Sequence, residues 1–143
     1  MAMIEHLSIG VRDIKRAIAF YDAVLAPLGY ARVLTVPGEG ENHPWASACY
    51  GLPGSDVDRD HGDCPFWLEE RPDAGAPRLP GFHICFQAPD RGAVHEFHSI
   101  GVKLGATDYG APGPRPHYGP DYYASFLLDL DGWHIEAVTF SGC

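Results

Sequence analysis

The chain has 143 residues, 45% of them hydrophobic, and a formal net charge of −9, which together predict one compact domain rather than a disordered chain. It has no block of lysines or arginines, so binding to nucleic acid through phosphate contacts is disfavoured. No apolar run approaches the roughly 18 residues of a membrane span, and no secretory leader is visible. We therefore expect a cytoplasmic protein whose partner is a small molecule or a metal cation, and neither nucleic acid nor a membrane.

The first half of the chain, residues 1–71, reads as a strand, a helix and three further strands. Asp13 is a candidate N-cap for a helix that continues to about Leu25 and ends before Pro27 and Gly29. Alternating hydrophobic residues predict strands over residues 3–11, 30–36, 45–51 and 64–70. A proline-rich linker follows at residues 72–80.

The second half, residues 81–143, follows the same plan. Asp90 is a candidate N-cap for a helix to about Lys103, and Asp131-Gly132 is a hairpin turn signal. The proline-rich segment from Gly110 to Pro120 is expected to be a loop. The predicted strands cover residues 81–88, 106–109, 121–129 and 133–140.

The two halves repeat each other. The segment IEHLSIGVRD (residues 4–13) aligns without a gap on GFHICFQAPD (residues 81–90), which places His6 on His83 and Asp13 on Asp90. A spacing of 77 residues is too long for a solenoid repeat of roughly 20–50 residues. The pattern predicts an α+β fold of two tandem βαβββ modules, mostly antiparallel within each. A helix would cover one face of each sheet, and the other face would curve around a cavity.

Histidine and glutamate recur at matching places in the two halves. Placing FWLE (residues 66–69) on WHIE (residues 133–136) aligns Glu69 with Glu136. Imidazole and carboxylate together suit a divalent metal, and a carboxylate in an apolar strand such as that of Glu136 is costly unless it is paired or ligates a metal. A hydrogen-bonded structural role for each histidine, and a solvated ion pair for Glu69, are the alternatives.

These motifs, together with AFYDAVLAPLGY and DLDGWHIEAV, resemble the vicinal oxygen chelate superfamily of glyoxalase I, bleomycin and fosfomycin resistance proteins and extradiol dioxygenases. The resemblance covers essentially the whole chain. It implies one curved, cup-like mixed sheet with helices on its outer face, around a divalent metal (Zn, Ni, Fe, Mn or Co), and a homodimer. It assigns His6, His83 and Glu136 as metal ligands, with Glu69 near a fourth ligand position.

The segment PRPHY followed by YYASF resembles small bacterial glyoxalase-like proteins and implies a pocket wall that includes Tyr122 and Phe126. Arg115 would face a substrate carboxylate, and His117 would shuttle protons near neutral pH. Glu136, or Glu69 if it reaches the metal, would act as the base. Ordinary packing of a proline-rich loop is the alternative. The other residues expected to bind substrate are Tyr118, Tyr123 and Trp67.

Three functions are compatible with these features. The leading one is a metal-dependent lyase or isomerase that acts on a small oxygenated metabolite held by bidentate chelation. The second is an extradiol-type ferrous dioxygenase, although such enzymes resemble longer chains. The third is a non-catalytic ligand-binding protein of the bleomycin-resistance type. Fosfomycin resistance is disfavoured because an anionic phosphonate needs more cationic side chains.

The four cysteines form no CxxC pair, which argues against a zinc finger or a thioredoxin-like motif. Free, reduced thiols are expected in a chain without a secretory leader. Cys85 lies within a predicted strand and is expected to be a small core residue. The other three cysteines are Cys49, Cys64 and Cys143.

Overall fold

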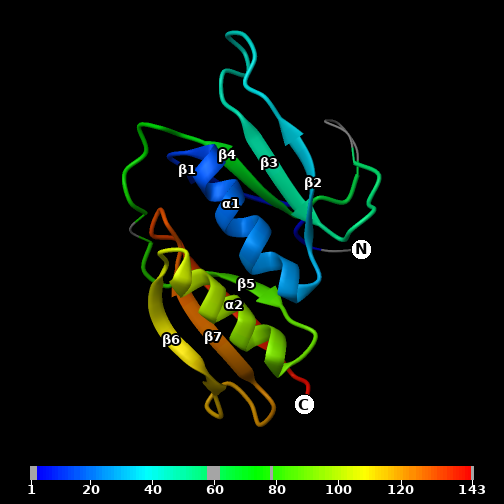
Figure 1. Ribbon diagram of the computed structural model, residues 1–143, viewed down its shortest axis with the longest axis vertical. Helices are drawn as coiled ribbons and strands as arrows, with labels where there is room; N and C mark the ends of the chain where they lie inside the picture. Colours follow the sequence, from blue (N-terminus) through cyan, green and yellow to red (C-terminus); the bar gives the residue numbers. More distant parts are fainter. Residues whose placement is uncertain (1–2, 58–61, 78, 143) are drawn as a thin grey trace. The chain divides into compact units, whose positions relative to one another are not determined.

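The computed structural model describes residues 3–57, 62–77 and 79–142, so that Cys143 lies outside the described residues. The chain divides into two compact units, one formed by Met1–Asp22 with Tyr30–Gly75, and the other by Ala23–Gly29 with Ala76–Cys143. Each unit contains one four-stranded mixed sheet (Figure 1). The predicted α+β class and the tandem βαβββ order are confirmed. One cup formed by both sheets stays a prediction, as does the single domain with halves 1–71 and 81–143.

The sheet of the first unit has the strand order β1-β4-β3-β2. The parallel pair β1–β4 lies at one side, and the pairs β2–β3 and β3–β4 are antiparallel. The strands are β1 (Leu7–Val11), β2 (Ala31–Val36), β3 (Ser47–Gly51) and β4 (Phe66–Glu70).

Helix α1 (Ile14–Leu25) begins and ends as its sequence predicts. The carboxylate of Asp13 accepts a hydrogen bond from the backbone N–H of Arg16 at 3.1 Å, which satisfies a free donor of the first turn. A short 3-10 helix (Ala26–Leu28) follows, and Gly29 ends it with a φ of 90°, a conformation that favours glycine. Among the described residues, no helix is both long and apolar enough to cross a bilayer.

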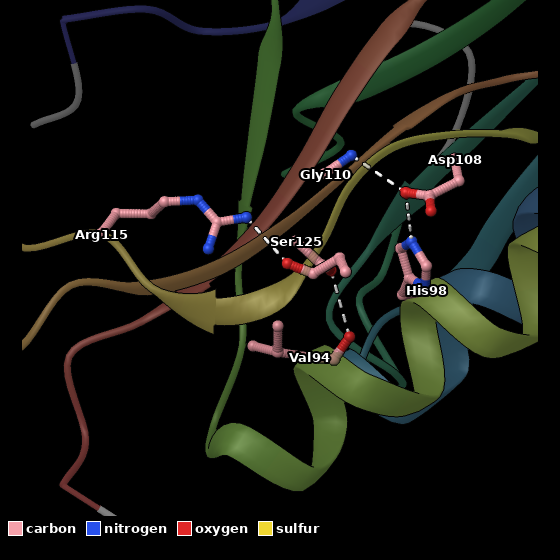
Figure 2. Close-up of polar contacts among 7 residues, drawn as sticks. Val94, His98, Asp108, Gly110, Arg115 and Ser125 are labelled. Carbon is pink, nitrogen blue, oxygen red and sulfur yellow. Dashed lines mark hydrogen bonds and ion pairs between the residues drawn. The ribbon is translucent and has the colours of Figure 1, made fainter.

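The sheet of the second unit has the same topology, in the order β5-β8-β7-β6. Helix α2 (Arg91–Lys103) lies along this sheet (Figure 1), and Asp90 caps it by accepting from the N–H of Ala93 at 2.8 Å. The hydroxyl of Ser125 in β7 donates to the carbonyl of Val94 at 3.2 Å and ties strand to helix (Figure 2). The strands are β5 (Ile84–Gln87), β6 (Thr107–Pro114), β7 (Tyr123–Leu128) and β8 (His134–Thr139).

The proline-rich segment after Gly110 is partly a strand, so the prediction of a loop from this residue was wrong. Strand β6 continues to Pro114 because it is the edge strand of its sheet, where a missing N–H is tolerated. Its pairing with β7 shifts register twice, between Asp108 and Gly110 and between Gly110 and Gly113. Asp108 supports this irregular edge by accepting from the Gly110 N–H and contacting the ring of His98 (Figure 2).

The cysteines also differ from expectation. Cys49 and Cys64 form a disulfide with a Cα–Cα distance of 6.0 Å, so the prediction of free thiols was wrong for this pair. The chain brings them together because β3 pairs with β4 and Cys64 lies just before β4. Cys85 is free and exposed rather than a core residue. The cytoplasmic location stays a prediction.

Candidate active site

The open face of the second sheet carries a buried carboxylate. Alternation along β8 directs Ile135 and Ala137 to one face and Glu136 to the other, and only 1% of the Glu136 side chain is exposed. Its Oε2 lies 3.0 Å from Nε2 of His83, which directly precedes β5. Its Oε1 accepts a hydrogen bond of 2.5 Å from the hydroxyl of Tyr122, which directly precedes β7. Both oxygens of the carboxylate therefore have a polar partner, as a buried charge requires.

The carboxylate changes the proton affinity of its neighbours. Desolvation, the hydrogen bond to Glu136 and its charge raise the pKa of Tyr122, so Tyr122 keeps its proton. Cys85 is directly opposite Glu136 in the β5–β8 register. Desolvation by the surrounding side chains, followed by the Glu136 charge, raises the pKa of this thiol to about 12.

Aromatic rings surround the imidazole of His134, two residues before Glu136. Its ring centroid lies 5.0 Å from that of His83, 4.9 Å from that of Tyr109 and 5.4 Å from that of Phe126. Within the described part of the chain, its buried Nε2 has no hydrogen-bond partner. Desolvation and the neighbouring His83 lower the pKa of His134, which favours a neutral ring.

The pair His83–Glu136 fits two positions of a divalent-metal site. Two ligands about 2.1 Å from one ion, at right angles to each other, lie about 3.0 Å apart, which matches the separation of His83 Nε2 and Glu136 Oε2. The His83 side chain is 41% exposed, so its nitrogen is accessible. Within residues 3–57, 62–77 and 79–142, no group of three or more His, Cys, Asp or Glu side chains is placed to hold an ion. The participation of His6 in a common site with His83 and Glu136 stays a prediction.

The first unit has a polar cavity at the matching end of its sheet, with a volume of about 400 Å³. His6 lines it and contacts the carboxylate of Glu5. Trp67 and Glu69 also line it, and Glu69 forms an ion pair with Arg71 at 2.8 Å. Both partners of this pair are partly exposed, so it is the solvated pair expected as the alternative role for Glu69.

The strand registers correct the alignment of the two halves at their ends. Leu7, directly after His6, pairs with Phe66, whereas Ile84, directly after His83, pairs with Ile135. Phe66 is therefore equivalent to Ile135, and counting along the strands makes Trp67 the equivalent of Glu136. Glu69 corresponds to Val138, so the predicted match between Glu69 and Glu136 was wrong by two residues. A two-residue shift preserves the alternation of faces, which is why hydrophobic pattern alone did not expose it.

The Arg115 side chain forms hydrogen bonds with the backbone of the edge strand β6. Its guanidinium donates to the carbonyl oxygens of Ala111, Gly113 and Pro114 at 2.8 to 3.3 Å and lies 5.5 Å above the ring of Phe126. These acceptors belong to the part of β6 in which its register against β7 shifts. Its hydrogen-bonding capacity is thus directed to backbone rather than to an open pocket.

The predicted wall residues separate onto two faces. The rings of His117 and Tyr118 lie 4.2 Å apart, and Tyr118 lies 5.2 Å from Tyr122, which places both beside the Glu136 site. Tyr123 is directed to the helix side instead, where its hydroxyl is 2.6 Å from Nε2 of His95. The structure does not bring Tyr123 together with Glu136.

Two neighbours of Glu136 were not identified as its partners from the sequence. Tyr122 was visible only as a possible wall residue, and Cys85 only as a core residue. The signal available for Tyr122 was the buried carboxylate itself, since a glutamate in an apolar strand requires a donor, and of two consecutive tyrosines only one can face it.

No family model and no curated protein matches the sequence. Solved structures do. A glyoxalase/bleomycin resistance protein from Albidiferax ferrireducens T118 superposes with a TM-score of 0.71 and 26% identity, over 96% of this chain and 98% of that one. Glyoxalase I from Zea mays gives a TM-score of 0.70 and 18% identity, over 95% of this chain and 45% of that one.

The fosfomycin resistance protein FosX from Listeria monocytogenes, solved with Mn(II) and 1S,2S-dihydroxypropylphosphonic acid, gives a TM-score of 0.64 and 15% identity, over 96% of this chain and 92% of that one. Identities this low establish the fold alone. The structural neighbours of the chain are thus proteins of the glyoxalase/bleomycin resistance/dioxygenase family, and the chain has the fold of the vicinal oxygen chelate superfamily.

Proposed function

We propose that the protein is a metal-dependent enzyme of the lyase or isomerase type that acts on a small oxygenated metabolite. His83 and Glu136 would hold the ion, with His6 as a third ligand. The observation that carries this proposal is the Glu136 carboxylate, 1% exposed and 3.0 Å from the imidazole of His83. An imidazole and a carboxylate, together with open positions, are what a divalent ion needs to chelate two oxygens of a substrate.

Different side chains would bind the ion, transfer protons and contact the substrate. A bound divalent ion supplies Lewis acidity toward a substrate oxygen. We assign Glu136 proton transfer to and from the substrate carbon, in which Oε2 would release the ion to accept the proton. The exposed His117 lies against Tyr118, with ring centroids 4.2 Å apart, and would exchange protons between the site and solvent. Tyr118 would form the aromatic wall, and Trp67, in the cavity with His6, would contact substrate from the first unit.

A non-catalytic ligand-binding protein is the second candidate. It is favoured by two features of the second unit: Glu136 already has partners for both oxygens, and the rings of Tyr118, Tyr122 and Phe140 form a continuous aromatic strip beside it. Such a strip suits a flat ligand without any ion.

The metal content of the purified protein separates the two candidates. Protein prepared without chelator and analysed by inductively coupled plasma mass spectrometry is expected to carry about one divalent ion per chain. His83→Ala and His6→Ala should lose it, whereas His95→Ala, on α2 beside Tyr123, should keep it.

A metal-free wild-type protein that also fails to bind added Zn²⁺, Ni²⁺, Mn²⁺ or Fe²⁺ would contradict the enzyme proposal and favour the binding protein. Oxygen uptake by the anaerobically iron-loaded protein with catechol-type compounds would favour the dioxygenase instead. We expect no uptake.

A further inference from the structure

We propose that Tyr122 is a positioning residue for the Glu136 carboxylate. Its hydroxyl holds Oε1, so that only Oε2 is presented to His83 and to a ligand of the site. The inference deepens the proposed function, because it concerns the same carboxylate, and it rests on that function where the metal is concerned.

The hydrogen bond is placed to fix the carboxylate plane. Tyr122 donates to Oε1 at 2.5 Å, while Oε2 lies 3.0 Å from His83 Nε2. With Tyr122 on one oxygen and His83 on the other, rotation of the carboxylate would break a hydrogen bond to a buried oxygen, which is unfavourable. Glu136 is therefore preorganised to offer a single oxygen, and a single oxygen makes it a monodentate ligand.

Tyr122 is itself held in place by rings. Its centroid lies 5.2 Å from that of Tyr118, and 5.3 Å from that of Phe140 at an interplanar angle of 90°. A phenylalanine at residue 122 would keep both ring contacts and would lose only the hydroxyl. The hydrogen bond can thus be removed without emptying the space that the ring fills.

The internal repeat supports the pairing of tyrosine with glutamate. In the first unit, Phe66 pairs with Tyr50 as Ile135 pairs with Leu127 in the second. Counting five residues back from Tyr50 and from Leu127 makes Trp45 the equivalent of Tyr122. In the second unit, Glu136 thus has the hydroxyl of Tyr122 as a donor. In the first unit, both equivalent positions are tryptophans, Trp67 and Trp45.

The adjacent tyrosine offers a matched control. The Tyr123 hydroxyl contacts His95 at 2.6 Å, and Arg91 lies 4.7 Å above its ring, so that it serves the helix side of the same strand. Tyr122→Phe and Tyr123→Phe delete the same atom one residue apart, but only the first removes a partner of Glu136.

The test compares these two variants with the wild type in two measurements. The first is Co²⁺ affinity and the visible d–d spectrum of the Co²⁺ protein. Loss of a partner that orients a ligand weakens metal affinity about 10–100-fold, so Tyr122→Phe should bind Co²⁺ more weakly by about this factor and shift the spectrum. Tyr123→Phe should match the wild type in both, whatever its thermal stability.

The second measurement uses metal-free protein and follows the ¹⁵N chemical shifts of the His83 ring. Release of Oε1 lets the carboxylate turn away from His83, so Tyr122→Phe should move these signals and Tyr123→Phe should not. This readout depends on the position of the carboxylate and not on the metal.

The outcomes distinguish this inference from the proposed function. If the wild type binds Co²⁺ and Tyr122→Phe has the same affinity and spectrum, the positioning role is overturned and the metal site stands. If the wild type binds no metal, the proposed function fails, and the His83 signals decide the positioning role: displaced signals support it and unchanged signals overturn it.

Discussion

The two sheets share strand order and direction, and the register of β1, β4 and β3 matches that of β5, β8 and β7, yet they place different chemistry at equivalent positions. Where the second unit has Glu136, the first has Trp67. Where the second has Phe126, opposite Glu136 in the register, the first has Cys49, which forms a disulfide with Cys64. The two units therefore share a backbone pattern, but only the second unit has a glutamate at the position of Glu136.

The contrast extends to the faces that pack on the helices. Tyr50 in the first unit donates to Asp22 of α1 at 2.9 Å, whereas its equivalent, Leu127, is fully buried without a polar group. Each unit thus has its own way of stabilising the same topology. Substitutions confined to one unit should therefore alter the reactivity or stability of that unit.

The reactivity of the Cys85 thiol reports how far the Glu136 carboxylate raises the pKa of that thiol. A thiol pKa of about 12 predicts alkylation by iodoacetamide at pH 8 about a thousandfold slower than that of an ordinary free thiol, because the thiolate is the nucleophile. The rate should rise about tenfold per pH unit from 8 to 11 as the thiol deprotonates.

The measurement uses metal-free Cys143→Ser protein, followed by mass spectrometry. Glu136→Gln should accelerate the reaction at pH 8, while Glu69→Gln, which affects only the Arg71 pair, should not. Fast alkylation of the parent protein would show that the thiol pKa is not raised, and equal rates in the parent and Glu136→Gln would show that the carboxylate does not contribute to it.

The disulfide between Cys49 and Cys64 should stabilise the first unit. A cross-link across 15 residues contributes about 3 kcal/mol through the entropy of the unfolded chain. The double variant Cys49→Ser/Cys64→Ser should lower the free energy of unfolding by about this amount in urea denaturation followed by circular dichroism.

Reductant supplies the control. Dithiothreitol should destabilise the wild type and leave the double variant unchanged, and Cys85→Ser should behave as the wild type. Equal stability with and without reductant would contradict a stabilising cross-link.

The buried hydroxyl of Tyr50 should contribute less to the free energy of unfolding than the disulfide does. Tyr50→Phe removes the hydrogen bond to Asp22 but leaves the Arg32–Asp22 contact of 3.2 Å, so the expected loss is about 1 kcal/mol. Leu127→Met in the second unit alters only apolar packing and serves as the comparison. A Tyr50→Phe protein as stable as the wild type in the same urea experiment would contradict the assignment.

The pair formed by His98 and Asp108 should give the smallest effect. The hydrogen bond from His98, aided by the Gly110 N–H, lowers the pKa of Asp108 below its ordinary value of 3.8. A lowered carboxyl pKa stabilises the fold above pH 3.8, and this contribution is lost as pH falls further. Asp108→Asn should therefore flatten the dependence of melting temperature on pH below about 4. The same decrease in melting temperature below pH 4 in the variant and the wild type would contradict this role of Asp108.

The sequence was sufficient to predict the order of elements and both helix caps. Hydrophobic alternation reports strands well, and Asp13 and Asp90 bond to the helix N–H groups as expected. The prolines after Gly110 predict a loop, but the edge strand β6 tolerates them and continues to Pro114.

Parts of the site could not be predicted, for reasons of register and distance. Glu69 was matched to Glu136 because a two-residue slip leaves the facing pattern intact. The pairing of Cys49 with Cys64 requires the β3–β4 register, and the engagement of Arg115 by backbone carbonyls requires the irregular course of β6. Periodicity contains none of this information.

We infer that Glu136 is the functional carboxylate and that Trp67 occupies the equivalent position in the first unit. Calorimetric titration of metal-free wild type, Glu136→Gln and Glu69→Gln with Ni²⁺ separates the two glutamates. We predict that Glu136→Gln loses measurable binding, whereas Glu69→Gln binds one ion with the affinity of the wild type. Loss of binding in Glu69→Gln with retention in Glu136→Gln would contradict the account.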